Sequence, residues 1–255
     1  MKIKVLGCSG AESPGMNSPA FLLDDEFLFD AGTLASVLGE RQQMKIRSIF
    51  VTHAHLDHIR GIPFLADNIV MARKRRRVTV YSIPSVVTTI RKHLFNSAVW
   101  PDFTVIPHPD DAILKLVKVK EGRAVREGEY RVTPYRVDHT VPSVGYLVED
   151  GKGRRLFYTG DTGPTNGTWE KIGKRKIHCL IIDVSFPNSM EELAITTGHL
   201  TPRLLRAELA KMILPPGRVL ITHPKPHHRK TIEAEIRKMG TDGMRLLVDG
   251  ETIRV

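Results

Sequence analysis

The chain has 255 residues, of which 41% are hydrophobic, and a formal net charge of +10 from 38 Lys and Arg against 28 Asp and Glu. This length suits one large domain or two small ones with a sizeable core, and the basic balance favours anionic partners. No apolar run reaches the length of about 18 residues that a membrane helix needs, and the N-terminal apolar stretch is too short for a secretory signal. We therefore expect a cytoplasmic protein with no membrane span. The two cysteines, Cys8 and Cys179, are expected to be buried thiols rather than a disulfide or metal ligands.

Short hydrophobic or alternating segments recur along the chain and predict strands. In chain order they cover residues 3–6, 20–23, 27–29, 48–52, 78–83, 113–119, 130–137, 144–148, 156–158, 180–184, 219–222 and 244–248. Helical spacing predicts helices at 34–41, 59–71, 86–95, 168–172, 202–212 and 231–239, with a short one at 191–195. Thr201 as N-cap and Pro202 at the first helical position mark the start of the helix at 202.

The order of these elements favours an α/β fold. A group of strands followed by helices in each half predicts two mixed sheets packed face to face with helices outside, which is an αββα sandwich. The Pro- and Gly-rich segments at 10–19 and 101–109 have the length of loops rather than of domain linkers, and no internal repeat is visible. We therefore expect one domain over residues 1–255.

The most informative run is His53-Ala54-His55-Leu56-Asp57-His58, which follows the predicted strand 48–52 and leads into a predicted helix. It places three imidazoles and one carboxylate on an expected loop. Packing of a hydrophobic core does not require four such polar residues within six positions. Imidazole and carboxylate are, however, the ligands that suit zinc and related divalent ions. Because alternate residues after a strand can point at different ions, the run predicts a two-metal site.

The pattern H-x-H-x-D-H resembles the signature of the metallo-β-lactamase superfamily. The resemblance implies an αββα sandwich and further ligands downstream, each after a strand. It implies His53, His55 and His139 for the first metal, Asp57, His58 and His223 for the second, and Asp161 as the bridging carboxylate. Zinc is the expected metal, with manganese and iron as alternatives.

Three further segments are similar to class II cyclic-nucleotide phosphodiesterases of this superfamily. The run His55-Leu56-Asp57-His58 is followed by a hydrophobic stretch that contains Gly61; the segment 95–101 resembles F-N-x-x-[IV]-W-P; and the segment 198–202 resembles G-H-L-[ST]-P. The resemblance implies hydrolysis of a 3′,5′-cyclic nucleotide, cAMP or cGMP, to the 5′-monophosphate. In such a site a hydroxide held between two metals attacks phosphorus in line with the leaving oxygen.

The departing alkoxide needs a proton, and His199 is our candidate donor because it lies outside the implied ligand set, just before the predicted helix 202–212. We expect Asp183, after a predicted strand, to orient His199, and we count Asp57 as catalytic as well as a ligand. A structural hydrogen bond is the alternative role for His199 and Asp183. The pair also resembles the proton-donor pair of tRNA 3′-end endonucleases in this superfamily.

Four residues are candidates for substrate binding, with a plain turn or packing role as the alternative for each. They are Asn17 and Ser18, in the loop after the first strand, and Asn96 and Trp100, whose indole offers a face for a purine. The basic run Arg73 to Arg77 is typical of a solvated turn, and a nucleic-acid patch is the alternative.

Three other functions compete with a cyclic-nucleotide phosphodiesterase. A tRNA 3′-end-processing nuclease fits the positive charge, but the chain has no long Gly- and Pro-rich basic insertion of the kind that grips tRNA, so a nucleic-acid substrate is not favoured. A thioesterase, lactonase or arylsulfatase would use the same metal ligands. A non-catalytic nucleotide sensor is disfavoured because every implied ligand position is filled. A small-molecule cyclic nucleotide is therefore the expected partner, with a homodimer as a possibility.

Overall fold

The computed structural model describes residues 1–72, 76–240 and 243–255. In these residues the chain forms two sheets of seven strands each. The first sheet has the order β14 (Thr252–Arg254), β1 (Lys2–Gly7), β2 (Ala20–Leu23), β3 (Phe27–Phe29), β4 (Ser48–Phe50), β5 (Val78–Ser82), β6 (Leu114–Lys118). The second has the order β13 (Met244–Leu246), β12 (Val219–Thr222), β11 (Cys179–Asp183), β10 (Arg155–Tyr158), β9 (Ser143–Glu149), β8 (Tyr130–Val137), β7 (Val125–Glu127).

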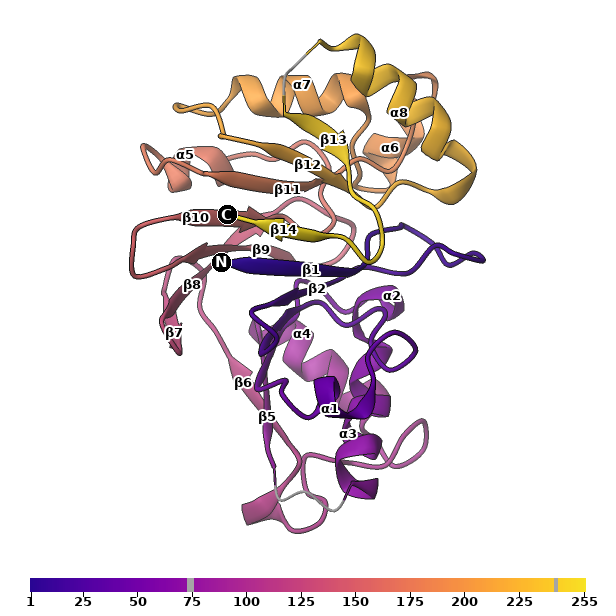
Figure 1. The fold of residues 1–255 in the computed structure, drawn as a ribbon, viewed down its shortest axis with the longest axis vertical. Coiled ribbons are helices and arrows are strands. Elements are labelled where there is room, and N and C mark those ends of the chain that lie inside the picture. The colour runs from indigo at the N-terminus through magenta and orange to yellow at the C-terminus, as the bar shows by residue number, and fades with distance from the viewer. Residues whose placement is uncertain (73–75, 241–242) are drawn as a thin grey trace.

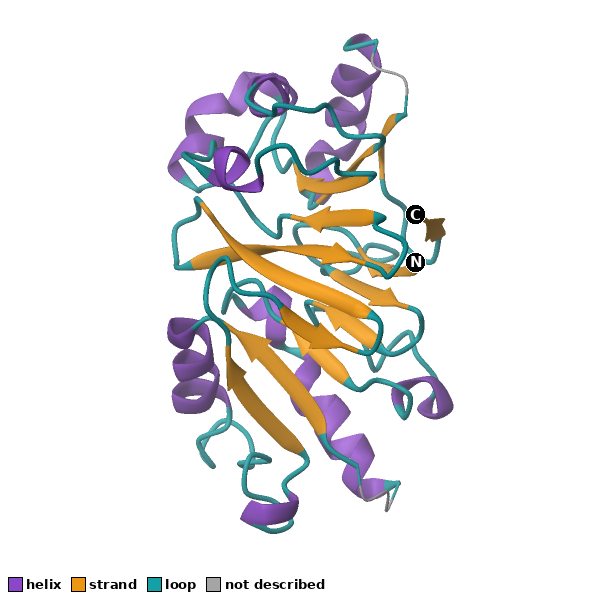
Figure 2. Cartoon of the chain, turned by 90° about the vertical axis from the view of Figure 1, so that its left-hand side faces the viewer, coloured by secondary structure: helices purple, strands orange, loops and turns teal. Residues whose placement is uncertain are grey.

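Helices cover the outer face of each sheet. Those of the N-terminal half are α1 (Glu40–Gln43), α2 (Leu56–Ile59), α3 (Gly61–Met71) and α4 (Pro84–Thr89), which continues into a π-helical turn at Ile90–Leu94. Those of the C-terminal half are α5 (Thr168–Ile172), α6 (Glu191–Thr196), α7 (Pro202–Ala210) and α8 (Arg229–Lys238), with short 3-10 turns at Asn188–Met190 and Pro226–His228. A further 3-10 turn, Pro109–Asp111, precedes β6. Figures 1 and 2 show the strands in the middle of the molecule and the two helical groups at opposite ends. The predicted αββα sandwich is confirmed.

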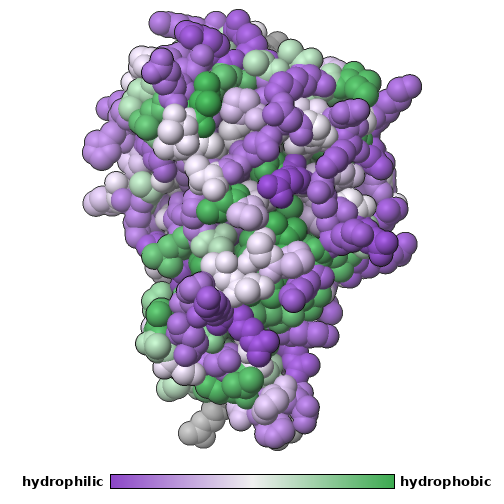
Figure 3. All heavy atoms as spheres, turned by 180° about the vertical axis from the view of Figure 1, so that it is seen from behind, coloured by the Kyte–Doolittle hydropathy of each residue, from purple (hydrophilic) through white to green (hydrophobic). Residues whose placement is uncertain are grey.

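The hydrophobic core has three layers because successive strand residues point to opposite faces. On β3 and β4, Leu28 and Ile49 face α3 and α4, whereas Phe29 and Phe50 face the second sheet, where their rings stack at 5.2 Å. On β11 the buried Leu180 belongs to a third layer beneath α5, α7 and α8. Seen from behind, hydrophobic side chains form scattered patches among mostly hydrophilic ones from the top to the bottom of the molecule (Figure 3).

Strand direction brings the functional residues to one edge. In the second sheet β10, β11 and β12 are parallel, and β8 has the same direction because β9 is antiparallel to both β8 and β10. In the first sheet β3, β4, β5 and β6 are parallel. Side chains that follow these strands therefore collect at the carboxyl ends of the strands.

Several predicted elements differ from the structure. The helix predicted at 34–41 is wrong: Leu34 and Leu38 are buried with helical spacing, but they form only an isolated turn, and Gly39 is extended before α1 begins. The expected loop at 53–58 is interrupted, because Asp57 and His58 lie in α2. The strands β7 and β14 were not predicted, since each has only three residues and forms by pairing with a longer neighbour. Both cysteines are buried free thiols.

Residues 73–75 of the basic run lie outside the described residues. None of the helices in the described part of the chain is long and apolar enough to cross a membrane.

Candidate metal centre and proton-donor pair

Seven side chains predicted as metal ligands meet at the carboxyl edge of the two sheets. His53 and His55 follow β4, and Asp57 and His58 lie in α2; His139 follows β8, Asp161 follows β10 and His223 follows β12. Their donor atoms form two groups, each with all members within 4.8 Å of one another: His53, His55, His139 and Asp161 in one, and Asp57, His58 and His223 in the other. The structure therefore brings together every residue of the predicted ligand set.

The carboxylate of Asp161 lies between the two groups. Its Oδ2 is 3.7 Å from Nε2 of His53 and 4.0 Å from Nε2 of His139, both in the first group. Toward the second group, Oδ1 is 3.3 Å from Nε2 of His58, and Oδ2 is 3.2 Å from Nε2 of His223. Ligand atoms around a tetrahedral zinc ion are about 3.4 Å apart, given bond lengths of 2.0–2.1 Å. The spacing fits a carboxylate shared by two ions.

Two buried nitrogen atoms support this fit. Nε2 of His53 and Nε2 of His58 are buried and have no hydrogen-bond partner, although both rings are inaccessible to water. Leaving a buried polar atom unpaired costs about 1–3 kcal/mol, so such atoms call for an explanation. Both atoms point into the cluster, where a divalent cation would satisfy them. The donor set and its geometry thus suit two divalent ions of the kind that bind imidazole and carboxylate.

The ionisation of the first group also suits a metal. Burial and the neighbouring imidazoles lower the pKa of His53, His55 and His139, which keeps these rings neutral and able to coordinate. Burial alone would raise the pKa of Asp161, but the positive charge of His223 and His58 outweighs burial and holds that pKa well below its usual range. Asp161 is therefore an anion.

In the second group, burial raises the pKa of Asp57, but His223 and His58 lower it by more. The pKa of Asp57 is therefore lowered to about 2. His58 behaves differently, because the carboxylates Asp161 and Asp30 outweigh burial and raise its pKa well above the usual value. His58 thus carries a proton that a divalent cation would replace.

Asp30 orients His58, and the sequence reasoning missed it. Asp30 is fully buried after β3, and its Oδ2 accepts hydrogen bonds from Nδ1 of His58 at 2.8 Å and from the hydroxyl of Tyr158 at 2.7 Å. Its Oδ1 accepts from the backbone N–H of Thr52 at 2.8 Å. A carboxylate on one ring nitrogen leaves the other nitrogen free to face a metal. The signal that could have found Asp30 is its place directly after the short apolar run of residues 27–29, which is a predicted strand.

His139 is oriented by a backbone carbonyl instead. Its Nδ1 donates to the carbonyl oxygen of Gly198 at 2.8 Å, so its Nε2 faces the cluster, 3.3 Å from Nδ1 of His55. Gly198 has a positive φ of 68°, and a Cβ there would lie 2.8 Å from Nδ1 of His139. The close approach of this backbone to His139 therefore requires glycine.

His199 and Asp183 form a buried pair beside the cluster. Nδ1 of His199 is 2.7 Å from Oδ2 of Asp183, and the His199 ring stacks on that of His223 with centroids 5.1 Å apart. Burial lowers the pKa of His199, but the charge of Asp183 outweighs burial and raises it overall. Because Nδ1 is held by Asp183, Nε2 is the nitrogen left to face the cluster. His199, Asp161 and His223 also lie close enough to share an ion, so metal content has to be measured to separate a ligand from a proton donor.

Ser185 links this pair to the cluster and was not predicted. Its buried Oγ donates to Oδ1 of Asp183 at 2.7 Å, lies 2.8 Å from Nδ1 of His223, and is 3.2 Å from Nδ1 of His199. No pattern in the sequence marks a single serine two residues after an aspartate. Its role is visible only once β11 and β12 lie side by side.

The four candidates for substrate binding are less closely tied to the cluster. Asn17 and Ser18 lie beside the first sheet, where Asn17 bonds to Leu6 and Asp249, and Ser18 is buried. The side chain of Asn96 bonds to the backbone of its own turn, at Lys92, Ala98 and Val99. Trp100 packs against the half-exposed Phe64 with ring centroids 5.3 Å apart. Among the described residues neither Asn96 nor Trp100 bonds to the cluster, and their role in substrate binding stays a prediction.

Comparison with known proteins gives a family and two kinds of relative. A family model described as a beta-lactamase superfamily domain matches residues 26–224. A probable 3′,5′-cyclic-nucleotide phosphodiesterase of Yersinia pestis is 27% identical over 237 residues, 81% of this chain but only 66% of that protein. Ribonuclease Z of Archaeoglobus fulgidus is 26% identical over 263 residues, 79% of this chain and 80% of that protein. The crystal structure of unliganded yeast PDE1 has a TM-score of 0.83 at 19% identity and covers 100% of this chain and 99% of that chain, which shows a shared fold.

Proposed function

This chain belongs to the metallo-β-lactamase superfamily, and we propose that it is a two-metal phosphodiesterase that hydrolyses 3′,5′-cyclic nucleotides, cAMP or cGMP, to 5′-monophosphates. The proposal treats residues 1–255 as one catalytic domain and zinc as the metal. The observation that carries it is the buried pair of His199 and Asp183 beside the cluster, because a site that only bound metals would have no need of an oriented histidine outside the seven predicted ligands.

The residues have separate tasks in this proposal. His53, His55 and His139 would hold one ion, and Asp57, His58 and His223 would hold the other. Asp161, which lies between the two groups, would be shared by both ions. When bound, the two ions supply an activated water and neutralise charge on the phosphate. Substrate reaches them from the side of His55 and Asp57, which are only partly buried, past the exposed Leu56.

His199 supplies the proton that the leaving O3′ needs. Asp183 accepts a hydrogen bond from Nδ1, which fixes the ring and stabilises its protonated form, so the proton to be transferred sits on Nε2. Ser185 donates to the second oxygen of Asp183 and so fixes the position of the carboxylate. When the ring of a 3′,5′-cyclic nucleotide opens, O3′ leaves phosphorus as a strongly basic alkoxide. Hydrolysis of a cyclic nucleotide therefore depends on a proton donor such as His199.

The short connections of the second sheet favour a small substrate over tRNA. The β8–β9 connection, residues 138–142, and the β9–β10 connection, residues 150–154, have five residues each. Neither can form an arm that grips tRNA. A tRNA 3′-end nuclease is nevertheless the second candidate, since Ribonuclease Z of Archaeoglobus fulgidus is about as similar as the Yersinia pestis phosphodiesterase.

His199→Ala tests the proposal on two substrates. We expect the variant to keep both metals and to lose on the order of 10² to 10⁴ in turnover of cAMP or cGMP, the usual range for a positioned acid. Bis(p-nitrophenyl) phosphate releases a weakly basic phenolate, so its turnover should fall far less. His93→Ala, at an exposed histidine, is the matched control.

The outcomes separate the alternatives. Equal losses on both substrates would make His199 a phosphate-positioning residue, and loss of a metal would make it a ligand. Products from cAMP, cGMP, 2′,3′-cyclic nucleotides and a pre-tRNA should be resolved with the parent protein. Efficient processing of pre-tRNA with no turnover of cyclic nucleotides would overturn the cyclic-nucleotide proposal.

A further inference from the structure

Two neighbouring cavities on the first sheet carry a concentration of positive charge that the metal centre does not use. The larger cavity has a volume of about 910 Å³ and lies between α4, its π-helical extension, the loop before β6, and β6 itself. The smaller has about 550 Å³ and lies at the start of β4 and β5. Arg77 lines both, so the two cavities meet at this residue, and we call them together the basic groove.

Cations outnumber carboxylates in the basic groove. Its cations are Lys45, Arg47, Arg76, Arg77, Arg91, Lys92, Lys115 and Lys118, and its carboxylates are Glu26, Asp102, Asp110 and Glu127. Glu26 pairs with Arg47 at 3.4 Å, and Glu127 accepts a hydrogen bond from Tyr81. Oδ1 of Asp102 accepts hydrogen bonds from the backbone N–H and the hydroxyl of Thr104 in its own turn. Most of the positive charge is therefore not neutralised inside the protein.

The exposed cations of the larger cavity have no acidic partner. Arg91, Lys92, Lys115 and Lys118 are solvent-exposed, and in the described ranges of the chain none of them lies within 4.0 Å of a carboxylate. An ordinary solvated surface of a folded protein mixes both signs of charge. Here one sign dominates a concave surface, which focuses the field on an approaching anion.

Two arginines of the groove are held in place by carbonyl groups rather than by carboxylates. Nε of Arg77 donates to the carbonyl of Ala112 at 3.0 Å, and its Nη2 donates to the carbonyl of Asp110 at 2.6 Å. Arg76 donates to the carbonyl of Ile46. Carbonyl groups fix the direction of a guanidinium without cancelling its charge. The remaining N–H groups of Arg77 are thus pre-positioned for an anion.

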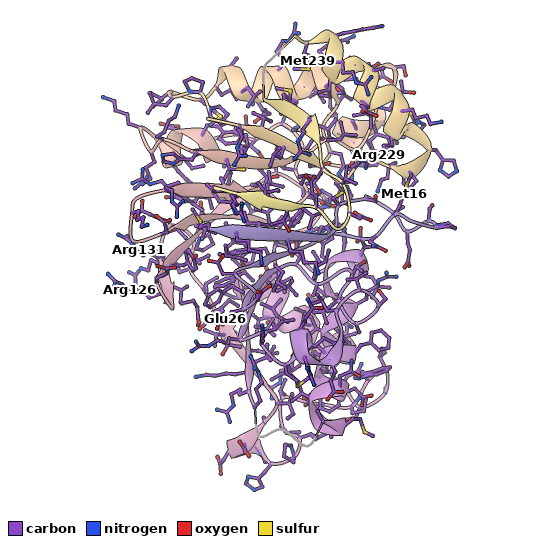
Figure 4. The ribbon with its side chains drawn as sticks, viewed as in Figure 1. Met16, Glu26, Arg126, Arg131, Arg229 and Met239 are labelled. Carbon is purple, nitrogen blue, oxygen red and sulfur yellow. The ribbon has the colours of Figure 1, made fainter. Side chains whose placement is uncertain are left out.

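The Arg77 end of the groove lies far from the metal centre, whereas Lys118 lies at the carboxyl end of β6. Arg77 precedes β5, whereas the cluster lies beyond the other end of that sheet; the five residues of β5 alone span about 13 Å. Figure 4 shows Glu26 on one flank of the molecule and Met16 on the opposite flank, and the loop of Met16 also carries Gly10, whose backbone abuts His223. A ligand bound at the Arg77 end of the groove would therefore not touch the reacting phosphate.

We propose that the basic groove binds the sugar–phosphate backbone of a single-stranded nucleic acid, at a site separate from the metal centre. A run of regularly spaced phosphates matches a groove with cations along both walls, whereas a single small anion would engage only a few of them. The aromatic side chain in the larger cavity, Phe95, is buried and offers no face for a base. Binding is therefore through the backbone and independent of base sequence.

The test measures binding of a fluorescein-labelled oligonucleotide of about 16 nucleotides, as RNA and as DNA, by anisotropy over a range of salt concentrations. The groove variant Arg91→Glu/Lys92→Glu/Lys115→Glu should bind about tenfold or more weaker. The slope of log affinity against log salt should become about 2 units shallower, since each phosphate contact on a single strand contributes roughly 0.7 and the variant removes three cations. The control variant Lys152→Glu/Lys174→Glu/Lys230→Glu makes the same charge change at exposed sites outside the groove.

Turnover of bis(p-nitrophenyl) phosphate should be unchanged in both variants, because neither alters the cluster; this readout distinguishes a failure of the groove from a failure of the proposed function. Equal weakening by the control variant would reduce the effect to total charge and overturn the proposal. The proposal is also wrong if the parent protein binds neither the RNA nor the DNA oligonucleotide. It is likewise wrong if polyglutamate of equal charge displaces the labelled oligonucleotide as well as an unlabelled oligonucleotide does. Stronger binding of RNA or of DNA would assign the kind of strand.

Discussion

Replacing Asp30 with Asn tests whether this buried carboxylate determines the second metal position. The amide keeps one acceptor oxygen for the backbone of Thr52, but it places an NH₂ group where Oδ2 now accepts from both His58 and Tyr158. Two hydrogen bonds to a charged acceptor are lost, each worth about 1.5–3 kcal/mol. The ring of His58 would then lose the bond that aims its Nε2 at Asp161.

The expected magnitudes follow from these contacts. We expect the free energy of unfolding of the chelator-treated protein to fall by about 3 kcal/mol, which allows some rearrangement of the Tyr158 hydroxyl. For a chain of this size that is a drop of roughly 6–12 °C in melting temperature. Affinity for the second ion should fall about 10- to 100-fold, the usual effect of removing a group that orients a ligand, while the first ion should be held nearly as before.

Urea unfolding in chelator and zinc competition with a coloured chelator measure the two effects separately. Asp25→Asn is the matched control, since Asp25 is partly exposed and its only ion pair among the described residues, with Lys2 at 3.8 Å, lies on the surface. If Asp30→Asn unfolded at the parent's urea concentration and held two ions with parental affinity, the proposed orienting role of Asp30 would be refuted.

Three more substitutions test the rest of the centre. Asp161→Ala should disturb both ions and His223→Ala mainly the second, as metal analysis by mass spectrometry would show; equal and small losses would argue against a shared carboxylate. Asp183→Asn removes the charge that raises the pKa of His199, and because the donor must be protonated, the high-pH decline of cyclic-nucleotide turnover should move to lower pH at unchanged metal content. Ser185→Ala should weaken binding of the second ion about tenfold, by removing the partner of the His223 Nδ1 atom, and an unchanged dissociation constant would contradict this.

Sequence reasoning identified the candidate centre well where the signal is local. The run from His53 to His58 combines ligand residue types with the spacing of a turn after a strand, and both features are written in six consecutive residues. The strands were found because alternation and short apolar runs are themselves local patterns. The same reasoning failed at residues 34–41, where Leu34 and Leu38 are buried in a loop with helical spacing.

Other features depend on contacts between distant segments. Asp30 accepts a hydrogen bond from Tyr158 across 128 positions of sequence, and its place after a short apolar run does not reveal this partner. Ser185 is a second example, since this serine stands in no recognisable pattern and yet its hydroxyl lies 2.8 Å from Nδ1 of His223.

The sequence by itself determined the kinds of side chain available for metal binding and the strands that precede them. It also supplied the resemblance through which the ligands were mapped. Only the tertiary structure decided which atoms meet: Asp57 and His223 are 166 positions apart, and they approach to 3.4 Å because parallel strands of two packed sheets end at a common edge. The same holds for the basic groove, whose cations come from separate elements and become neighbours when α4 packs beside β6. Residue types are fixed locally, whereas distances between them are set by how buried surfaces pack.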